Sequence, residues 1–259
     1  MTTLARHGGY RNPVTFRQVV GVIGEIFITL GVVVFLFLGY ELWFTGIYTA
    51  HSQSSLKAQL QREWATAAPQ PTGGGPGGPV GSTSPGESAP ASAPAQPAVT
   101  DVPVPGDAIG LIRIPRLGSN YAYAIVEGVS TDDLKKGPGH YPGSAQPGAV
   151  GNFVISGHRT TYLAPFSGLA DLQTGDAIVI ETADTWYTYR VIGEETVLPT
   201  DVAVILPVPR QPNATPTKAL ITLTTCTPKY SASHRLVVYG ELQSALPKSA
   251  GLPPALKGS

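Results

Sequence analysis

The longest hydrophobic run of the chain covers residues 19–44 and contains only two charged residues, Glu25 and Glu41. A helix needs about 20 mostly apolar residues to cross a bilayer, so this run predicts a transmembrane helix. Arg6, Arg11 and Arg17 precede it with no acidic residue among them, and positive charge is typical of the cytoplasmic side. The pattern predicts a single-pass protein of the cell membrane, with its N-terminus in the cytoplasm and the rest of the chain outside.

A cleaved signal peptide is the main alternative to a retained anchor. Its apolar core would be shorter and followed by small residues. Here residues 42–51 read LWFTGIYTAH, which are largely bulky or aromatic. A buried helix of a soluble protein would not have such asymmetric flanks. The sequence therefore favours a retained anchor.

Two segments of different character come after the apolar run. Leu56, Leu60 and Trp64 are spaced four apart, which predicts a short helix with one apolar stripe. It would lie on the membrane, pair with a copy of itself, or form a solvated stub. Residues 68–106 are mostly Pro, Gly, Ser and Ala and contain no Lys, Arg or aromatic residue. Such a composition buries too little apolar surface to fold and predicts a disordered tether, with a root-mean-square span of roughly 35 Å.

Beyond the tether, hydrophobic residues alternate with polar ones in short runs separated by Gly and Pro. In one run, Ile221, Leu223 and Thr225 alternate with Thr222 and Thr224, the period of a half-buried strand. Many short strands of this kind indicate an all-β sandwich or barrel. Strands are predicted at 108–114, 121–127, 152–156, 177–181, 186–194, 219–226 and 235–242.

The predicted organisation has six parts. They are a cytoplasmic N-terminus (1–17), a transmembrane anchor (18–48), a juxtamembrane helix (49–67), the tether (68–106), a folded domain (107–243) and a C-terminal tail (244–259) with no assigned role.

Composition narrows the chemistry. Formal net charge is zero and only 13% of residues are charged, against about 25% in ordinary soluble proteins. Since no basic block is present, nucleic acid is not expected as a partner. Neither an acidic cluster suited to calcium nor a Cys/His spacing suited to zinc occurs, so no metal or other cofactor is expected.

The single cysteine, Cys226, ends the predicted strand 219–226. One cysteine cannot form an intramolecular disulfide, so in an exported domain it indicates an intermolecular bridge or a working thiol. A buried structural cysteine is the alternative. A catalytic thiol needs a nearby base or cation and a donor for the developing oxyanion. Arg235, at the start of the next predicted strand, is a candidate cation.

Three histidines lie in the predicted domain. His158 follows strand 152–156 in GNFVISGHR, which places it at the rim of the sheet. His140 in GPGHYPG is interpreted as a loop residue that fixes local structure. His234 would point to the side of its strand opposite Arg235. His158 is thus the candidate partner of Cys226.

TLTTC, followed nine residues later by Arg235 and preceded by GNFVISGHR, resembles the sortase signature. The resemblance continues through IGLIRIPRLG, VEGVSTDDLKKGPGHYPGS, FSGLADLQTGD and RLVVYGEL, and so covers nearly the whole domain. The details GPGHYPG, GHRTTY and TLTTCTP are most similar to the class E housekeeping sortases of actinobacteria. The resemblance implies an all-β, closed barrel of about eight strands with short helices.

The resemblance also implies a role for each site residue. Cys226 would attack the carbonyl between Thr and Gly of a sorting motif and form a thioacyl enzyme. His158 would protonate the leaving amine and then deprotonate the incoming one. Arg235 would donate hydrogen bonds to the oxyanion or to the backbone of the motif. Thr225 would help to shape the oxyanion site.

The same resemblance implies specificity and partners. Class E members prefer LAxTG over LPxTG, with a tyrosine that contacts the motif, and Tyr121 is assigned to that role with Tyr123 as the alternative. The partners would be exported proteins that carry a sorting signal, and an amine on a lipid-linked peptidoglycan precursor or on a pilin. Thr227 departs from the residues that relatives often carry after the cysteine, which bears on substrate choice.

Two other functions compete with a sortase. An L,D-transpeptidase is also an exported cysteine acyl-transferase, but its Ser-His-Gly motif is absent around Cys226. The other is a non-catalytic, membrane-tethered β-barrel binding module with Cys226 buried.

Overall fold

The computed structural model describes residues 16–67 and 104–257. Nearly all of the predicted cytoplasmic N-terminus and nearly all of the predicted tether lie outside these ranges. The chain divides into two compact units, Met1–Phe44 and Thr45–Ser259.

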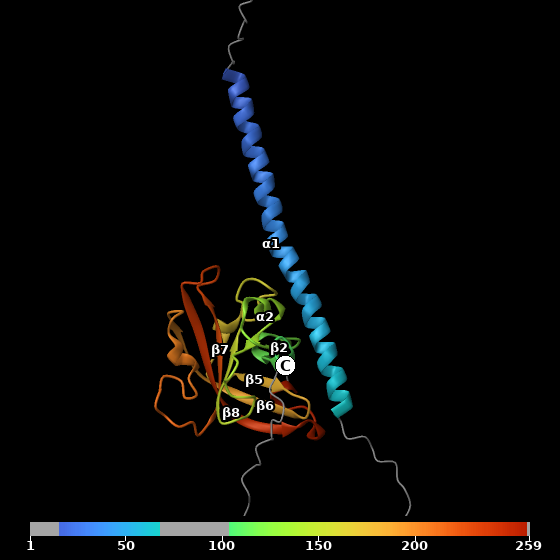
Figure 1. The fold of residues 1–259 in the computed structure, drawn as a ribbon, viewed down its shortest axis with the longest axis vertical. Coiled ribbons are helices and arrows are strands. Elements are labelled where there is room, and N and C mark those ends of the chain that lie inside the picture. The colour runs from blue at the N-terminus through green and yellow to red at the C-terminus, as the bar shows by residue number, and fades with distance from the viewer. Residues whose placement is uncertain (1–15, 68–103, 258–259) are drawn as a thin grey trace, which may run out of the picture. The chain divides into compact units, whose positions relative to one another are not determined.

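One helix, α1 (Phe16–Ala67), contributes to both units (Figure 1). Its residues Phe16–Tyr40 are long and apolar enough to cross a membrane. The sequence predicts a separate juxtamembrane helix, whereas α1 continues through that region without a break. No proline interrupts residues 41–67, so nothing in the local sequence ends the helix.

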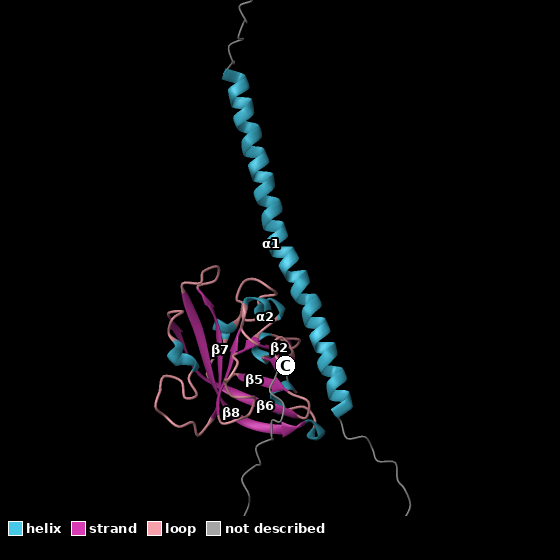
Figure 2. Ribbon diagram, viewed as in Figure 1, coloured by secondary structure: helices cyan, strands magenta, loops and turns pink. Residues whose placement is uncertain are grey.

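The second unit is built on a closed barrel of eight strands, shown in magenta in Figure 2. Their order around the barrel is β1-β2-β3-β4-β7-β8-β6-β5, which confirms the predicted fold class. The strands are β1 (Ala108–Arg113), β2 (Tyr123–Glu127), β3 (Gly139–His140), β4 (Gly151–Ser156), β5 (Ala177–Glu181), β6 (Thr185–Val197), β7 (Ala219–Thr227) and β8 (His234–Pro247). Apart from its part of α1, the helical pieces described in this unit are short: α2 (Thr131–Lys136) and five 3₁₀ turns.

The period-two pattern of β7 separates its buried face from its outer face. Ile221 and Leu223 are fully buried in the main hydrophobic core, and Thr222 and Thr224, which alternate with them, face the other side of the sheet. There Thr222 donates to Asn152 of β4 at 2.7 Å, and the hydroxyls of Thr224 and Ser156 are hydrogen-bonded. The barrel interior is thus apolar, and the outer face of β4 and β7 is polar.

The last strand, β8, continues five residues past the predicted end of that strand, to Pro247. It does so because it pairs with β6 along almost its whole length. Leu246 near its end, and the later turn Pro254–Leu256, pack against Val179 and Trp186. Residues 244–256 are therefore part of the folded unit.

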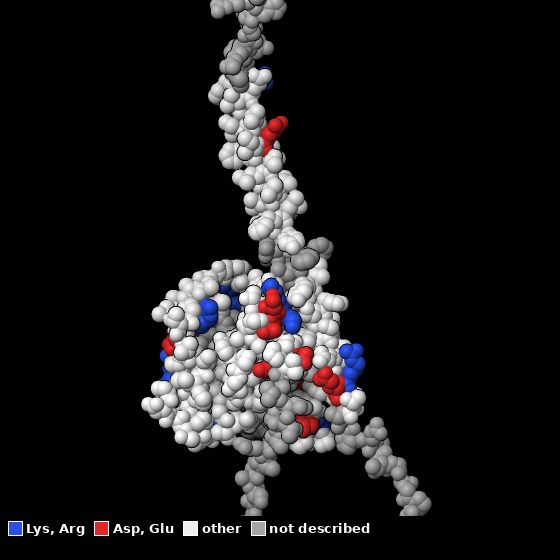
Figure 3. All heavy atoms as spheres, viewed as in Figure 1, with Lys and Arg blue, Asp and Glu red and all other residues white. Residues whose placement is uncertain are grey.

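Charged side chains form no single-sign patch on the face drawn in Figure 3, where acidic and basic residues are intermixed on a mostly uncharged surface. This distribution agrees with the formal net charge of zero.

Candidate active site

Strand register brings the three predicted catalytic residues to one edge of the barrel. β4 and β7 run parallel, and Ser156 pairs with Thr224. His158 and Cys226 each lie two residues beyond that pair, so the two strands carry them to the same edge of the barrel. In the antiparallel pair β7–β8, Cys226 lies directly opposite Arg235. Histidine, cysteine and arginine thus occupy neighbouring strand ends.

Two hydrogen bonds tie the end of β4 to the end of β7 beyond the ladder. The Gly157 amide donates to the Thr224 carbonyl at 3.1 Å, and the Thr225 hydroxyl donates to the Gly157 carbonyl at 2.7 Å. Thr225 is only 3% exposed. Its side chain therefore points inward and fixes the residue before His158 relative to the residue before Cys226.

Cys226 is the only cysteine of the chain, and it is free and half-buried. Its side chain lies on the same face of β7 as Thr224, since side chains alternate along a strand. That face is the polar outer face of the barrel, where a substrate can approach.

Burial lowers the pKa of His158. Its ring lies 4.8 Å from that of Tyr162, and its carbonyl accepts from the Phe166 amide at 3.0 Å. The Nε2 atom is buried and has no hydrogen-bond partner among the described residues, the Cys226 thiol included. The imidazole is thus held by its loop and keeps one nitrogen available.

The loop after His158 is conformationally strained. Tyr162, Leu163 and Ala164 have φ values of 52°, 60° and 44°, three consecutive residues in the region that non-glycine residues rarely occupy. At the start of this loop, a Cβ on Gly157 would lie 2.6 Å from a ring carbon of Phe166, so only glycine fits. Strain of this kind concentrates at functional sites.

Arg159 is a residue to which the sequence alone assigns no role. Its Nη1 donates to the main-chain carbonyl of Cys226 at 3.2 Å, while its buried Nε has no partner among the described residues. It therefore links the histidine loop to the cysteine. The GHR motif contains a signal for this contact. An arginine that follows a histidine at the rim of the sheet is long enough to reach the end of the neighbouring strand.

Arg235 uses only one nitrogen in the contacts it makes. Nη1 donates to the carbonyls of Ala232 and His234, both at 3.0 Å, which braces the loop between β7 and β8. Nε and Nη2 have no hydrogen-bond partner within residues 16–67 and 104–257. Two donors of the guanidinium thus remain available to another molecule.

A narrow cleft of about 80 Å³ opens beside Arg235, on the outer face of the barrel. Ser156, Thr224 and Val237 contribute to its lining, and the segment after β6 forms its far side. Leu198 and Val202 of that segment are exposed hydrophobic residues. The cleft thus combines polar strand residues with apolar side chains beside Arg235. A larger cavity of about 560 Å³ near the opposite end of β7 contains none of the predicted site residues.

The two tyrosines predicted to contact substrate lie against the histidine loop. The Tyr121 hydroxyl donates to the Pro165 carbonyl at 2.8 Å, and the Tyr123 hydroxyl donates to the Leu163 carbonyl at 3.4 Å. Burial raises the pKa of Tyr121 well above its ordinary value. Both phenols therefore support the loop that carries His158.

His140 is fully buried away from the thiol. Its Nδ1 lies 2.6 Å from the Glu127 carboxylate and its Nε2 lies 2.8 Å from the Ser144 hydroxyl. Its ring packs on Phe153. With both nitrogens engaged, His140 braces local structure as predicted, but it does so from strand β3 and not from a loop. Among the described residues, no group of three His, Cys, Asp or Glu side chains is arranged to hold a metal.

These features define a β-barrel protein with a cysteine-centred candidate active site. The sortase domain family matches residues 112–243. Sortase SrtE1 of Streptomyces coelicolor is 36% identical over 90% of this chain and 60% of its own length. Sortase SrtE2 of the same organism is 32% identical over 87% of this chain and 82% of its own length. The chain belongs to the sortase family.

Solved structures agree with this assignment. Sortase E from Streptomyces avermitilis superposes with a TM-score of 0.55 at 42% identity, over 60% of this chain and 99% of that chain. The match with SrtE1 spans less than two thirds of that relative.

Proposed function

We propose that this protein is a class E sortase, a cysteine transpeptidase that cleaves an LAxTG- or LPxTG-type sorting motif between Thr and Gly. The observation that carries the proposal is the register of β4, β7 and β8, which places His158, Cys226 and Arg235 at adjacent strand ends. Family membership supports the reaction type. Sortase E1 of S. coelicolor has been crystallised with a tripeptide in its active site, which supports a peptide as substrate here.

The reaction has two halves. The Cys226 thiol gives its proton to His158, its sulfur attacks the threonyl carbonyl carbon, the C–N bond to glycine breaks, and the leaving amine takes that proton from His158. An incoming amine then attacks the thioester, His158 takes the proton of that amine, and a new amide forms as the thiolate leaves. Burial favours the neutral form of His158, which suits the base of this second half.

Arg235 is the proposed oxyanion donor. Its Nε and Nη2 have no partner among the described residues, and it lies directly opposite Cys226. A planar fork with two free donors can bind a developing oxyanion and a neighbouring backbone carbonyl together. Thr225 keeps Cys226 and His158 in register, and Tyr121 or Tyr123 would contact the motif at the edge of the same site.

The proposed partners are exported proteins with a sorting signal and an amine on a lipid-linked cell-wall precursor. The segment Phe16–Tyr40 supports a single-pass membrane anchor. The arginines before it favour a cytoplasmic N-terminus, with the catalytic unit outside the cell.

The test uses the full-length chain in detergent with fluorogenic LAxTG and LPxTG peptides. Wild type is expected to cleave at least one peptide, and Cys226→Ala neither. A membrane-impermeant methanethiosulfonate should label the half-buried thiol and abolish turnover. If the folded protein cleaves neither peptide and its thiol resists the reagent, the binding-module alternative is favoured instead.

A further inference from the structure

The second half of α1 packs on the outer face of the barrel, within the unit Thr45–Ser259. Leu56 and Leu60 are 8% and 2% exposed and lie in one hydrophobic cluster with Ala108, Leu111, Ala124 and Val126 of β1 and β2. The apolar stripe identified in the sequence thus faces the catalytic unit, neither the membrane nor a second copy.

Gln53 pairs with the main chain of β2 as a further strand would. Its side-chain amide donates to the Ala124 carbonyl at 3.0 Å and accepts from the Ala124 amide at 2.7 Å. It also donates to the Lys136 carbonyl at 2.8 Å. β3 has only two residues and pairs with Val126 and Glu127, so it leaves the edge of β2 open at Ala124. Gln53, only 4% exposed, fills that edge.

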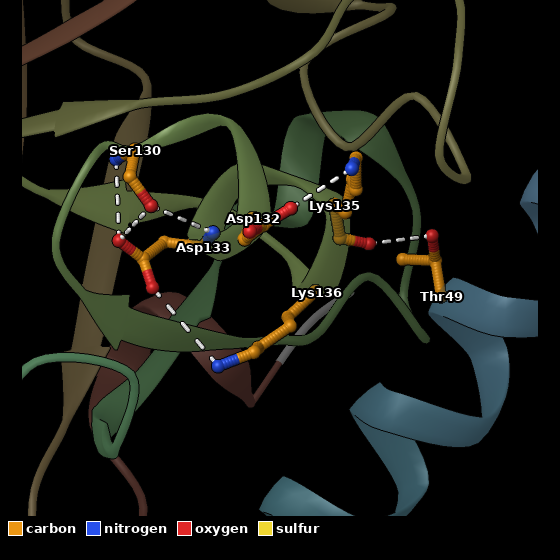
Figure 4. A network of polar contacts seen from close by, with 6 residues as sticks. All are labelled: Thr49, Ser130, Asp132, Asp133, Lys135 and Lys136. Atoms are coloured by element: carbon orange, nitrogen blue, oxygen red, sulfur yellow. Dashed lines mark hydrogen bonds and ion pairs between the residues drawn. The ribbon is translucent and has the colours of Figure 1, made fainter.

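Two further side chains of α1 reach the barrel on either side of Gln53. Lys57 Nζ donates to the Ala122 carbonyl at 2.6 Å. Thr49 Oγ1 donates to the Lys135 carbonyl at 2.7 Å, at the end of α2 (Figure 4). The start of α2 is itself fixed by a capping box between Ser130 and Asp133. α1 therefore holds residues 122–124. This segment contains Tyr123 and directly follows Tyr121.

Those tyrosines continue the connection to His158. Their hydroxyls bind the carbonyls of Leu163 and Pro165 in the strained loop. Leu163 also faces α1 directly, since a Cβ at Gly46 would lie 3.9 Å from its Cδ2. The amide of Phe166, the residue after Pro165, donates to the His158 carbonyl.

We propose that residues 45–67 of α1 are a positioning element of the active site. Through Gln53 and Lys57 they hold the segment of the two tyrosines, and the tyrosines in turn hold the loop that carries His158. This inference rests on the proposed function for its catalytic consequence. Without α1, the edge of β2 would lose its partners, and the loop would lose the support that holds three residues in a strained conformation.

The experiment uses the full-length chain in lipid nanodiscs. Gln53→Leu keeps the size of the side chain but removes three hydrogen bonds, and Gln61→Leu is the matched control because Gln61 is exposed on the same helix. We expect Gln53→Leu to lower kcat for the LAxTG peptide roughly 10- to 100-fold with little change in KM, because small misplacements of a catalytic group have effects of this size. Gln61→Leu should match wild type.

A second readout does not depend on turnover. The pKa of His158, followed by NMR of histidine-labelled protein and assigned with His158→Asn, should rise towards its ordinary value in Gln53→Leu as the loop opens to water. If Gln53→Leu does not fold, Lys57→Met removes the hydrogen bond to the Ala122 carbonyl and the cation–π contact with Tyr123 but keeps the apolar stem, and the same shift is expected.

The outcomes separate the two proposals. An unchanged kcat and an unchanged His158 pKa in a folded variant, even with a lower unfolding temperature, would make α1 a purely structural support and overturn the inference. If wild type cleaves no peptide, the proposed function fails, and the pKa comparison still decides whether α1 positions His158.

Discussion

Replacing Thr225 by valine isolates the hydrogen bond that ties the histidine loop to the cysteine strand. Valine keeps the β-branched shape that fits the strand but cannot donate to the Gly157 carbonyl, 2.7 Å away. Both residues are buried, so the carbonyl loses its partner without gaining water. Leaving one buried group unpaired costs about 1–3 kcal/mol. At about 2–4 °C per kcal/mol for a unit of this size, the unfolding temperature should fall by about 2–12 °C.

Activity should fall by more than the loss of stability explains. Gly157 precedes His158 and Thr225 precedes Cys226, so the bond constrains the separation of the proposed acid–base residue and the proposed nucleophile. We expect Thr225→Val to lower kcat for peptide cleavage at a temperature well below its unfolding midpoint. Calorimetry and steady-state kinetics on the same preparation measure the two effects.

Thr188→Val is the matched control, because Thr188 is a buried threonine of β6 whose hydroxyl has no hydrogen-bond partner among the described residues. It should lower neither quantity. If Thr225→Val also retains the unfolding temperature and kcat of wild type, then this hydrogen bond neither stabilises the barrel edge nor aligns the site, and the reasoning is wrong.

Three further predictions address other parts of the molecule. Arg235→Lys should reduce kcat at least about tenfold, since lysine lacks the planar fork; near-normal turnover would argue against an oxyanion role. Because burial lowers the pKa of His158, the unfolded chain binds more protons than the folded one below about pH 6.5. Stability is therefore lost as pH falls from about 6.5 towards the lower pKa of the folded state. His158→Gln should flatten this decline in calorimetry, and an equally steep decline would contradict the assignment. Lys248 Nζ lies 3.7 Å from the Trp64 ring centroid and 3.0 Å from a Glu181 carboxylate oxygen. Lys248→Met should therefore lower the free energy of unfolding by about 1–2 kcal/mol. No change in denaturant titrations would show that these contacts add nothing to stability.

The barrel and the cysteine–histidine pair could be predicted because their signals are local. The alternation around Ile221 and Leu223 identifies the buried face of a strand, and Gly157 before His158 identifies the end of another. The functional assignment of these residues came from the resemblance to a family, since periodicity alone left a buried cysteine as an alternative.

The docking of α1 could not be predicted, because its partner is a surface that forms only when β1 and β2 pair. The stripe of Leu56, Leu60 and Trp64 is visible in the sequence, but a helix that precedes a Pro/Gly/Ser/Ala segment suggests a part separate from the domain. Gln53 carries no sequence signal at all. Its role depends on β3 being too short to cover Ala124, which is a property of the folded sheet.

The C-terminal segment differs from its expected state for a similar physical reason. Its prolines suggest a tail from residue 244, yet β8 continues to Pro247 because β6 offers it a partner over thirteen residues. Lys248 then reaches Trp64 of α1 and Trp186 of β6. A strand end is set by the length of its neighbour, and no local propensity reports that length.

The parallel pair β4–β7 explains why a site exists at this edge. In a barrel of antiparallel hairpins, consecutive strands end at opposite edges, and residues just beyond two neighbouring strands lie far apart. Here the chain between β4 and β7 makes β5 and β6 on the other side of the barrel. It then returns, and β7 pairs with β4 in the same direction. The ends of both strands therefore bring His158 and Cys226 to the same edge. β8 runs the other way, so its first residues, with Arg235, begin there. The three candidate catalytic groups meet because two strands end and one starts at a single edge, and α1 supports that edge from outside through the tyrosines.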